Sequence, residues 1–449
     1  MNKNIFVDDI YVDDVRGKEY DIIFLSCKDS YDGKDDHGLY QIFKYFHNTL
    51  EEDCAFISIF DRQIPHPENY LIYDTNKHNT ISPDLVTRLP KHNKIIMGDK
   101  NDVLEAVLSL ILEKYNSEIF YVTMVNNAHT GLCAYPTSHS CEKYKHSAGC
   151  YSCPDILERL LKEHGPAIYE KPVAPEASQY AKARFDTHAA FLEKYSDRVT
   201  LCAVSTFALE QAAESYLYKD VRKLLTPLKN VFPAASNTDE LFRIRAMHKE
   251  MVLREVHNNG FKEVKKLCYW SAWDPSIPRK GLRYYIDALH LLVSEHLTPE
   301  QVAEIGFIFS GDPKKMGFYH SLMPGAAKKI IVPLLMSEQV VECLCASDLY
   351  VCTTLEDAGP RTVGEALACG TPVVSFDRCV ATDLVDSSCG SLVKTYDVKA
   401  LAAAMAKVLT STDTEINDYS LNAYKSFNNF YSDENMKESW TLALEGRCK

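Results

Sequence analysis

The chain has 449 residues, 46% of them hydrophobic, and a formal net charge of −13. This length and composition predict two folded domains with full cores. The acidic charge argues against a nucleic-acid binder, which needs a basic face. No stretch is apolar for long enough to cross a membrane, and the first residues, MNKNIFVDDIYVDD, contain no signal-peptide core. We therefore expect a cytoplasmic protein, with peripheral association at the inner face of a membrane left open.

In the first half of the chain, short apolar runs alternate with helical patterns, which is typical of parallel βαβ units. The apolar runs predict strands at 20–27, 55–60, 94–98, 119–125 and 199–205. Between them, apolar residues at three- and four-residue spacing predict helices near 38–52 and 101–115.

A second series of the same kind follows. It predicts strands at 265–272, 306–312, 329–335, 348–354 and 371–377, and helices at 281–296, 337–346, 361–369 and 397–410. The predicted fold class is therefore α/β, with two doubly wound, Rossmann-like sheets joined near residues 233–239. Ligands bind to such sheets outside the carboxyl ends of the strands, and residues 355–365 lie at such an end.

The stretch LEDAGPRTVGEALACGTPVVSFD (355–377) has the pattern of a turn, a short helix and a buried strand. Gly359 and Pro360 favour a turn that opens a helix at Arg361 and Thr362. A helix N-terminus carries free N–H groups and a partial positive charge, and an arginine beside it adds a full one. We expect a phosphate or carboxylate to bind there.

Three features together resemble the retaining glycosyltransferases of the GT-B fold, family 4. They are EALACGTPVVSFD, the acid Asp357 eight residues before Glu365, and RKGLRYYIDAL (279–289). The resemblance covers most of the chain. It implies an acceptor-binding domain over 1–235, a nucleotide-sugar domain over 236–425, and a C-terminal helix over 426–449 that packs back on the first domain.

The resemblance also implies a reaction. A sugar would move from a UDP- or GDP-sugar to a glycan or lipid-linked glycan, without a catalytic metal and by front-face displacement. No convincing DxD metal motif occurs near the site, in agreement with this expectation.

Roles for single residues follow from the same resemblance. Glu365 would bind the ribose and Asp357, where the family usually has glutamate, the transferred sugar. Lys280, supported by Arg279, would meet the charge on the leaving diphosphate. The remaining donor-binding candidates are Gly281, Gly359, Arg361 and Thr362.

The strand before residue 126 lacks the histidine that many relatives carry at its end. His129 is the nearest candidate for that catalytic role, although a histidine in a loop is more often a surface residue.

Four cysteines follow the pattern C-x7-C-x8-C-x2-C, namely Cys133, Cys141, Cys150 and Cys153. The closing C-x2-C spacing is common in structural zinc ribbons, so we predict a structural zinc, with scattered reduced thiols as the main alternative and disulfides as a minor one. The surrounding segment, 129–154, resembles a cysteine-bearing loop of a surface-polysaccharide subgroup of the colanic-acid type.

Two other functional classes stay open. A pseudoenzyme that serves as a zinc-stabilised interaction module would keep the fold without turnover, and the missing strand-end histidine is compatible with it. A nucleotide-sugar epimerase also uses two such sheets, but the acid pair and the RKGL motif fit it less well.

Overall fold

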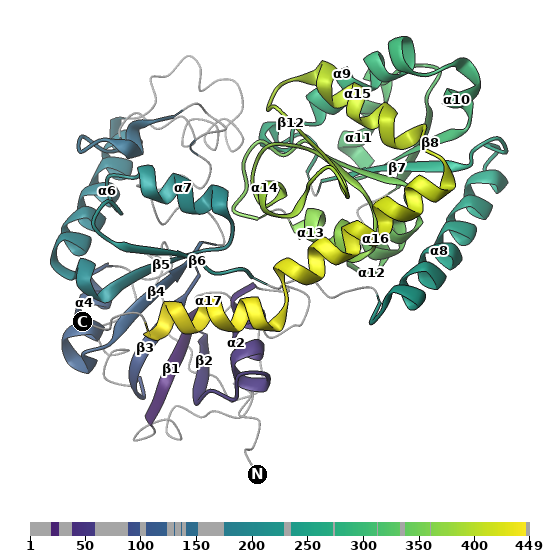
Figure 1. Cartoon of the computed structure of the whole chain (residues 1–449). Coiled ribbons are helices and arrows are strands. Elements are labelled where there is room, and N and C mark those ends of the chain that lie inside the picture. The colour runs from purple at the N-terminus through teal and green to yellow at the C-terminus, as the bar shows by residue number, and fades with distance from the viewer. Residues whose placement is uncertain are drawn as a thin grey trace. The chain divides into compact units, whose positions relative to one another are not determined.

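The computed structural model describes residues 19–26, 38–58, 89–98, 105–123, 130, 136, 141–150, 175–228, 235–272, 274–311, 313–332, 337–359 and 361–445. The chain divides into two compact units (Figure 1). One comprises Met1–Asn230 with Met436–Lys449, and the other comprises Val231–Asn435. The assignment of acceptor binding to the first unit and donor binding to the second stays a prediction.

The first unit is built on a parallel sheet in the order β2-β1-β3-β4-β5-β6. Its strands are β1 (Glu19–Ser26), β2 (Cys54–Ser58), β3 (Lys91–Met97), β4 (Glu118–Val122), β5 (Val199–Ala203) and β6 (Arg222–Leu225). The predicted strands of this half are confirmed, and β6 was missed.

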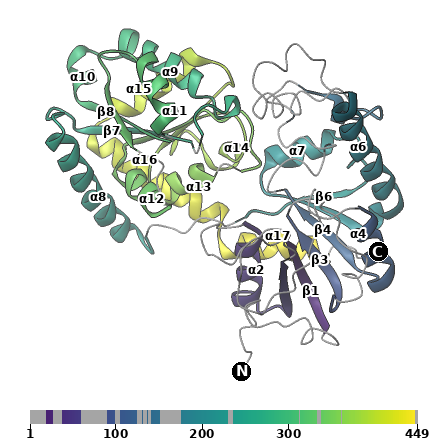
Figure 2. The ribbon, with the colours of Figure 1, turned by 180° about the vertical axis from the view of Figure 1, so that it is seen from behind.

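Helices cover both faces of this sheet, as the view from behind shows (Figure 2). They are α2 (Gly38–Asn48), α4 (Glu105–Tyr115), α6 (Pro175–Tyr195), α7 (Thr206–Glu214) and α17 (Asp433–Glu445), with short 3-10 turns at Lys143–Lys145 and Ser196–Arg198. The Phe24 ring of β1 lies 5.4 Å from that of Phe46 in α2, and the Phe46 ring lies 5.1 Å from that of Trp440 in α17. The C-terminal helix therefore contributes to the core of the first unit.

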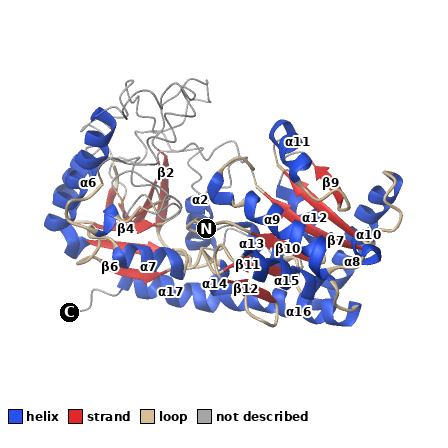
Figure 3. Cartoon of the chain, turned by 90° about the horizontal axis from the view of Figure 1, so that it is seen from above, coloured by secondary structure: helices blue, strands red, loops and turns tan. Residues whose placement is uncertain are grey.

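The second unit has a parallel sheet in the order β12-β11-β10-β7-β8-β9. Figure 3 shows strands of this sheet in red, with helices in blue around them. Its strands are β7 (Lys266–Ser271), β8 (Ile305–Ser310), β9 (Lys328–Val332), β10 (Leu349–Cys352), β11 (Val373–Phe376) and β12 (Gly390–Val393). In chain order this is the 3-2-1-4-5-6 arrangement of the Rossmann fold. The predicted strands of this half are also confirmed, except that β12 was missed.

Alternate side chains of β7 show how this sheet is buried on both faces. Cys268 and Trp270 belong to one apolar core, whereas Leu267 and Tyr269 belong to the other. The helices around these cores are α8 (Thr238–Asn258), α9 (Leu282–Leu291), α10 (Pro299–Ala303), α11 (Pro313–Leu322), α12 (Ser337–Ala346), α13 (Arg361–Ala368), α14 (Ala381–Leu384), α15 (Val398–Leu409) and α16 (Asp413–Phe430). A 3-10 turn at Pro278–Lys280 precedes α9, and a π-helical turn at Leu292–His296 follows it.

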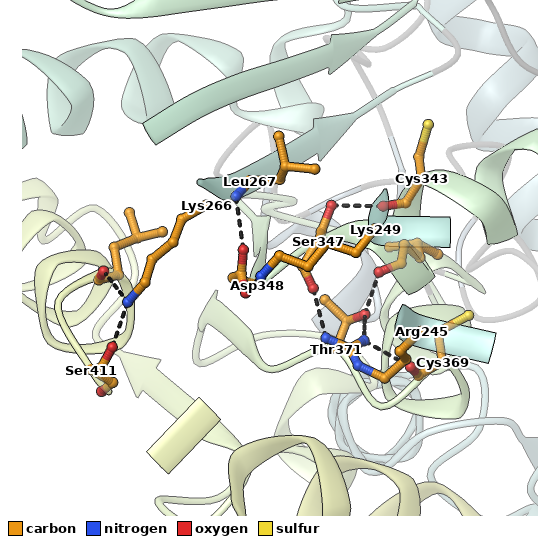
Figure 4. A network of polar contacts seen from close by, with 12 residues as sticks. Arg245, Lys249, Lys266, Leu267, Cys343, Ser347, Asp348, Cys369, Thr371 and Ser411 are labelled. Atoms are coloured by element: carbon orange, nitrogen blue, oxygen red, sulfur yellow. Dashed lines mark hydrogen bonds and ion pairs between the residues drawn. The ribbon is translucent and has the colours of Figure 1, made fainter. Parts of the chain in front are cut away.

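A buried arginine of α8 fixes the end of α13 (Figure 4). Arg245 donates hydrogen bonds of 2.9 Å to the carbonyl oxygens of Cys369 and Ser347 and to the hydroxyl of Thr371. A guanidinium with several acceptors in a buried place holds the segments that carry them in one geometry. The C-terminal end of α13 is therefore anchored, which sets the direction of its N-terminal end.

Candidate functional site

The site predicted from the sequence lies at the point of the second sheet where the strand order reverses, between β7 and β10. β7 pairs with β8 on one side and with β10 on the other, so the loops after β7 and β10 leave the sheet side by side. In open α/β sheets this switch point is the usual ligand-binding position. The first loop ends in Arg279 and Lys280, and the second contains Asp357.

Hydrogen bonds join the two loops. The backbone N–H of Leu355 donates to the carbonyl oxygen of Arg279 at 2.7 Å. The hydroxyl of Thr353 donates to the backbone carbonyl oxygen of Lys280 at 3.0 Å. The same hydroxyl accepts from the indole N–H of Trp270 at 3.0 Å. Both loops are therefore held before any ligand binds.

Gly281 makes this close approach possible. Its φ is +71°, and a Cβ built at this position would lie 2.0 Å from the carbonyl oxygen of Thr353. Only glycine adopts the left-handed region without strain and leaves room for the carbonyl. Gly281 is the N-cap residue of α9, and its conformation allows Lys280 to lie close to β10. Its role in donor binding stays a prediction.

The two cations of the first loop converge on the acid of the second. Oδ2 of Asp357 lies 3.0 Å from Nη1 of Arg279 and 3.0 Å from Nζ of Lys280. The three side chains are between 15% and 21% exposed. Burial disfavours the carboxylate, but Lys280 and Arg279 outweigh it and hold the pKa of Asp357 below its ordinary value. The trio carries one net positive charge at neutral pH.

The helix that follows begins at Arg361, as predicted. Nε of Arg361 donates to Oε1 of Glu365 at 2.6 Å, and the Glu365 side chain is only 10% exposed. The first turn of α13 contains no acidic residue. Thr362 lies in this first turn, and Gly359 is half-buried just before it. Pro360 lies outside the described residues.

The geometry brings together most of the predicted donor-binding residues. Arg279 and Lys280 end the loop after β7, and Arg361 is the first residue of α13, which follows the loop after β10. Such an arrangement suits a ligand with adjacent negative groups, because preformed donors and cations need no rearrangement to meet them. Sequence reasoning missed Cys379, whose Sγ accepts the backbone N–H of Asp357 at 3.1 Å.

The predicted catalytic histidine cannot be placed. His129 lies outside the described residues, between the end of β4 and Thr130. Its role stays a prediction.

The predicted zinc ligands can be placed only in part. Cys141 is half-buried, and Cys150 is buried in the apolar core of the first unit, whereas Cys133 and Cys153 lie outside the described residues. Among the residues that the structure does describe, no group of three or more His, Cys, Asp or Glu side chains could hold a metal ion. The structural zinc and the colanic-acid type subgroup stay predictions.

Within the described part of the chain, no helix combines the length and the apolar character that a membrane crossing requires.

Comparison with known proteins identifies the segment that carries this site. Residues 276–426 match the family model described as "Glycosyl transferases group 1", and this range includes both cations of the first loop, Asp357 of the second loop and Glu365 of α13. A search of curated proteins found no match.

Solved structures resemble the whole chain at low identity. Sucrose-phosphate synthase from Thermosynechococcus elongatus is 12% identical, with 95% of this chain and 98% of that chain covered and a TM-score of 0.58. HepE from Anabaena, crystallised with UDP, is 12% identical, with 95% and 100% covered and a TM-score of 0.58. The chain spans about half the length of a matched TarM structure from S. aureus, of which it covers 54%.

The two six-stranded parallel sheets are those of the GT-B fold, and residues 276–426, which contain Arg279, Lys280, Asp357 and Glu365, resemble the group 1 glycosyl transferases.

Proposed function

We propose that the protein is a retaining glycosyltransferase that moves a sugar from a UDP- or GDP-sugar to a glycan or lipid-linked glycan. The convergence of Arg279 and Lys280 on Asp357, at the carboxyl ends of β7 and β10, carries this proposal. These residues place positive charge at the switch point of the sheet, where ligands of such folds usually bind, and within the segment that matches the glycosyl transferase model. Positive charge at this position supports a phosphorylated ligand. The likeness to HepE, which was crystallised with UDP, adds support for the nucleotide.

The donor would bind at the switch point with its ribose near Glu365 and its sugar near Asp357. The diphosphate would meet Arg279, Lys280 and the N-terminus of α13. Glu365, one turn further into the helix, would accept hydrogen bonds from the ribose hydroxyls, and Asp357 would bind the transferred sugar. The two acids would therefore bind opposite ends of one donor.

Asp357 has a second consequence for donor binding. In the absence of a ligand its carboxylate neutralises part of the charge on the two cations. A diphosphate brings more negative charge and competes with Asp357 for the same N–H groups. Binding would thus release the Asp357 carboxylate toward the sugar hydroxyls, and its lowered pKa keeps it an acceptor there.

The reaction would proceed on one face of the sugar. The acceptor hydroxyl attacks the anomeric carbon as the bond to the β-phosphate oxygen breaks, and its proton passes to a phosphate oxygen of the leaving group. The products are the glycosylated acceptor, with the configuration retained, and the nucleoside diphosphate. Lys280 and Arg279 stabilise the negative charge that develops on the phosphate.

The test is an incubation of the purified protein with a panel of UDP- and GDP-sugars, with and without glycan acceptors. Release of nucleoside diphosphate together with a sugar product of retained anomeric configuration supports the proposal. A bound nucleotide without any product indicates the pseudoenzyme alternative, and an epimerised nucleotide-sugar indicates the epimerase. Melting curves with UDP, GDP, ADP and CMP identify the base, because a ligand of the folded state raises the melting temperature.

A further inference from the structure

Cys379 lies beside the candidate site in an uncommon backbone conformation. It follows β11, the neighbour of β10 in the sheet, and precedes α14. Its φ is +59°, which is in the left-handed region that few residues other than glycine adopt. The side chain is buried, at 1% exposure. Strained positions of this kind persist only where surrounding contacts hold them, and they cluster at functional sites.

Hydrogen bonds to its carbonyl oxygen and to its sulfur hold Cys379 in place. The hydroxyl of Thr382 donates to its carbonyl oxygen at 2.8 Å. Its Sγ accepts the backbone N–H of Asp357 at 3.1 Å. This second contact joins the loop after β11 to the loop after β10, at the residue whose carboxylate meets both cations.

The thiol is suited to a lasting contact of this kind. Burial, together with the nearby Asp357, Cys352 and Glu356, raises the pKa of Cys379 well above its ordinary value. Cys379 is therefore a neutral thiol at physiological pH, and it does not add a negative charge beside the carboxylate. A neutral sulfur accepts an N–H group without competing for Arg279 or Lys280.

We propose that Cys379 is a positioning residue for the transferred sugar, because it fixes the backbone of Asp357 and thereby the direction of its carboxylate. The inference rests on the proposed function, in which Asp357 binds the sugar rather than the nucleotide. Loss of the sulfur should therefore affect the sugar-dependent step and leave nucleotide binding intact.

The chain contains a matched control. Cys389 is also buried, in the same unit, and its Sγ also accepts the backbone N–H of an aspartate, Asp386, at 3.4 Å. It precedes β12 and so lies at the amino end of that strand, whereas the site lies at the carboxyl ends of the parallel strands. Cys379→Ala and Cys389→Ala thus each remove a sulfur that accepts an aspartate N–H, one near the site and one far from it, and Cys389→Ala also removes the weaker contacts of that sulfur to the carbonyl oxygens of Leu384 and Asp386.

The first measurement compares kcat and nucleotide affinity in these variants. We expect Cys379→Ala to lower kcat about tenfold while the Kd for the free nucleotide changes less than about twofold. Cys379→Ser keeps an acceptor at the same place and should recover most of the lost rate. Cys389→Ala should keep a kcat close to that of the unchanged protein. Melting temperatures confirm that each variant is folded.

The second measurement does not depend on activity. The amide hydrogen of Asp357 should exchange faster in Cys379→Ala, and at its original rate in Cys389→Ala.

Equal kcat in the two alanine variants, or unchanged exchange at Asp357 in Cys379→Ala, would overturn the inference and leave the proposed function standing. Joint losses of kcat and nucleotide affinity that serine does not restore would also overturn it, because they indicate a merely structural cysteine. Absence of turnover in the unchanged protein would instead contradict the proposed function, and the inference with it.

Discussion

The carboxylate of Asp357 accepts a hydrogen bond from the ammonium group of Lys280 at 3.0 Å, although the two residues are 77 positions apart in the chain. The contact exists because β7 and β10, which deliver these residues, are neighbours in the sheet. It places the charge that would neutralise a diphosphate beside the acid that would bind the sugar. The following predictions separate these two tasks.

Asp357→Asn should uncouple nucleotide binding from turnover. The change removes the anion that competes with a diphosphate for Arg279 and Lys280. A partly exposed ion pair contributes about 1 kcal/mol at most, so the free nucleotide should bind no more weakly and up to about fivefold more tightly. Turnover with a nucleotide-sugar should fall about a hundredfold, because a neutral amide replaces the acceptor for the sugar hydroxyls. Calorimetry with the nucleotide and a product assay provide the two values.

Glu365→Gln should give the opposite result. The ribose contact is present with and without the sugar, so its loss weakens binding of the bare nucleotide and raises KM more than it lowers kcat. Hydrogen bonds to a charged group contribute about 1.5–3 kcal/mol, which corresponds to a loss of affinity of at least about tenfold. Equal weakening of nucleotide binding in Asp357→Asn and Glu365→Gln would contradict the proposed orientation of the donor.

The local structure of this region was largely predictable, but its contacts were not. Gly359 and Pro360 correctly predicted that α13 begins at Arg361. The strands missed, β6 and β12, are four-residue strands at the edges of their sheets, with the sequences RKLL and GSLV. The edge strands β2 and β9 were predicted, so edge position alone does not explain the miss. RKLL begins with two charged residues and GSLV with two small ones, which leaves each run too few consecutive apolar residues to indicate a strand. The pairing of Asp357 with Lys280 depends on strand order, and the bond from Asp357 to Cys379 depends on the loop after β11. No local pattern encodes either of them.

Gly281→Ala should damage the site through the backbone. The added methyl group would meet the carbonyl oxygen of Thr353, and φ is +71°. Gly260→Ala is the matched control, because its φ is +95° but no atom lies within 4 Å of the added Cβ. The left-handed conformation costs each variant about 1–2 kcal/mol, and only Gly281→Ala adds a collision that must displace Lys280 or β10. We expect Gly281→Ala to lower the melting temperature by several degrees more than Gly260→Ala, and it alone to lose turnover. Equal melting temperatures would show that the loops after β7 and β10 separate freely.

Metal analysis tests the predicted zinc. Purified protein should contain about one equivalent of zinc per chain, and Cys150→Ser should lose both the metal and stability, because binding to a folded loop contributes to folding free energy. Cys54→Ser is the control, since Cys54 is a buried thiol of the same unit outside the cysteine segment. If the reduced protein contains no metal, and Cys150→Ser and Cys54→Ser destabilise the fold equally, the alternative of scattered reduced thiols is supported.

Lys280→Ala tests the central claim most directly. Negative charge accumulates on the β-phosphate oxygen as the glycosidic bond breaks, so a cation there stabilises the transition state more than the bound donor. Removal of one such contact typically costs about 3 kcal/mol, or roughly a hundredfold in rate. Lys399→Ala, at an exposed position of α15, provides the control for loss of one positive charge.

The measurement is the single-turnover rate of each variant beside its nucleotide Kd. The account predicts that Lys280→Ala folds, binds the nucleotide within about tenfold of the unchanged protein and turns over at least about a hundredfold more slowly, and that Lys399→Ala matches the unchanged protein in both values. Near-normal turnover in Lys280→Ala would contradict the account and transfer the role of the phosphate cation to Arg279 or Arg361.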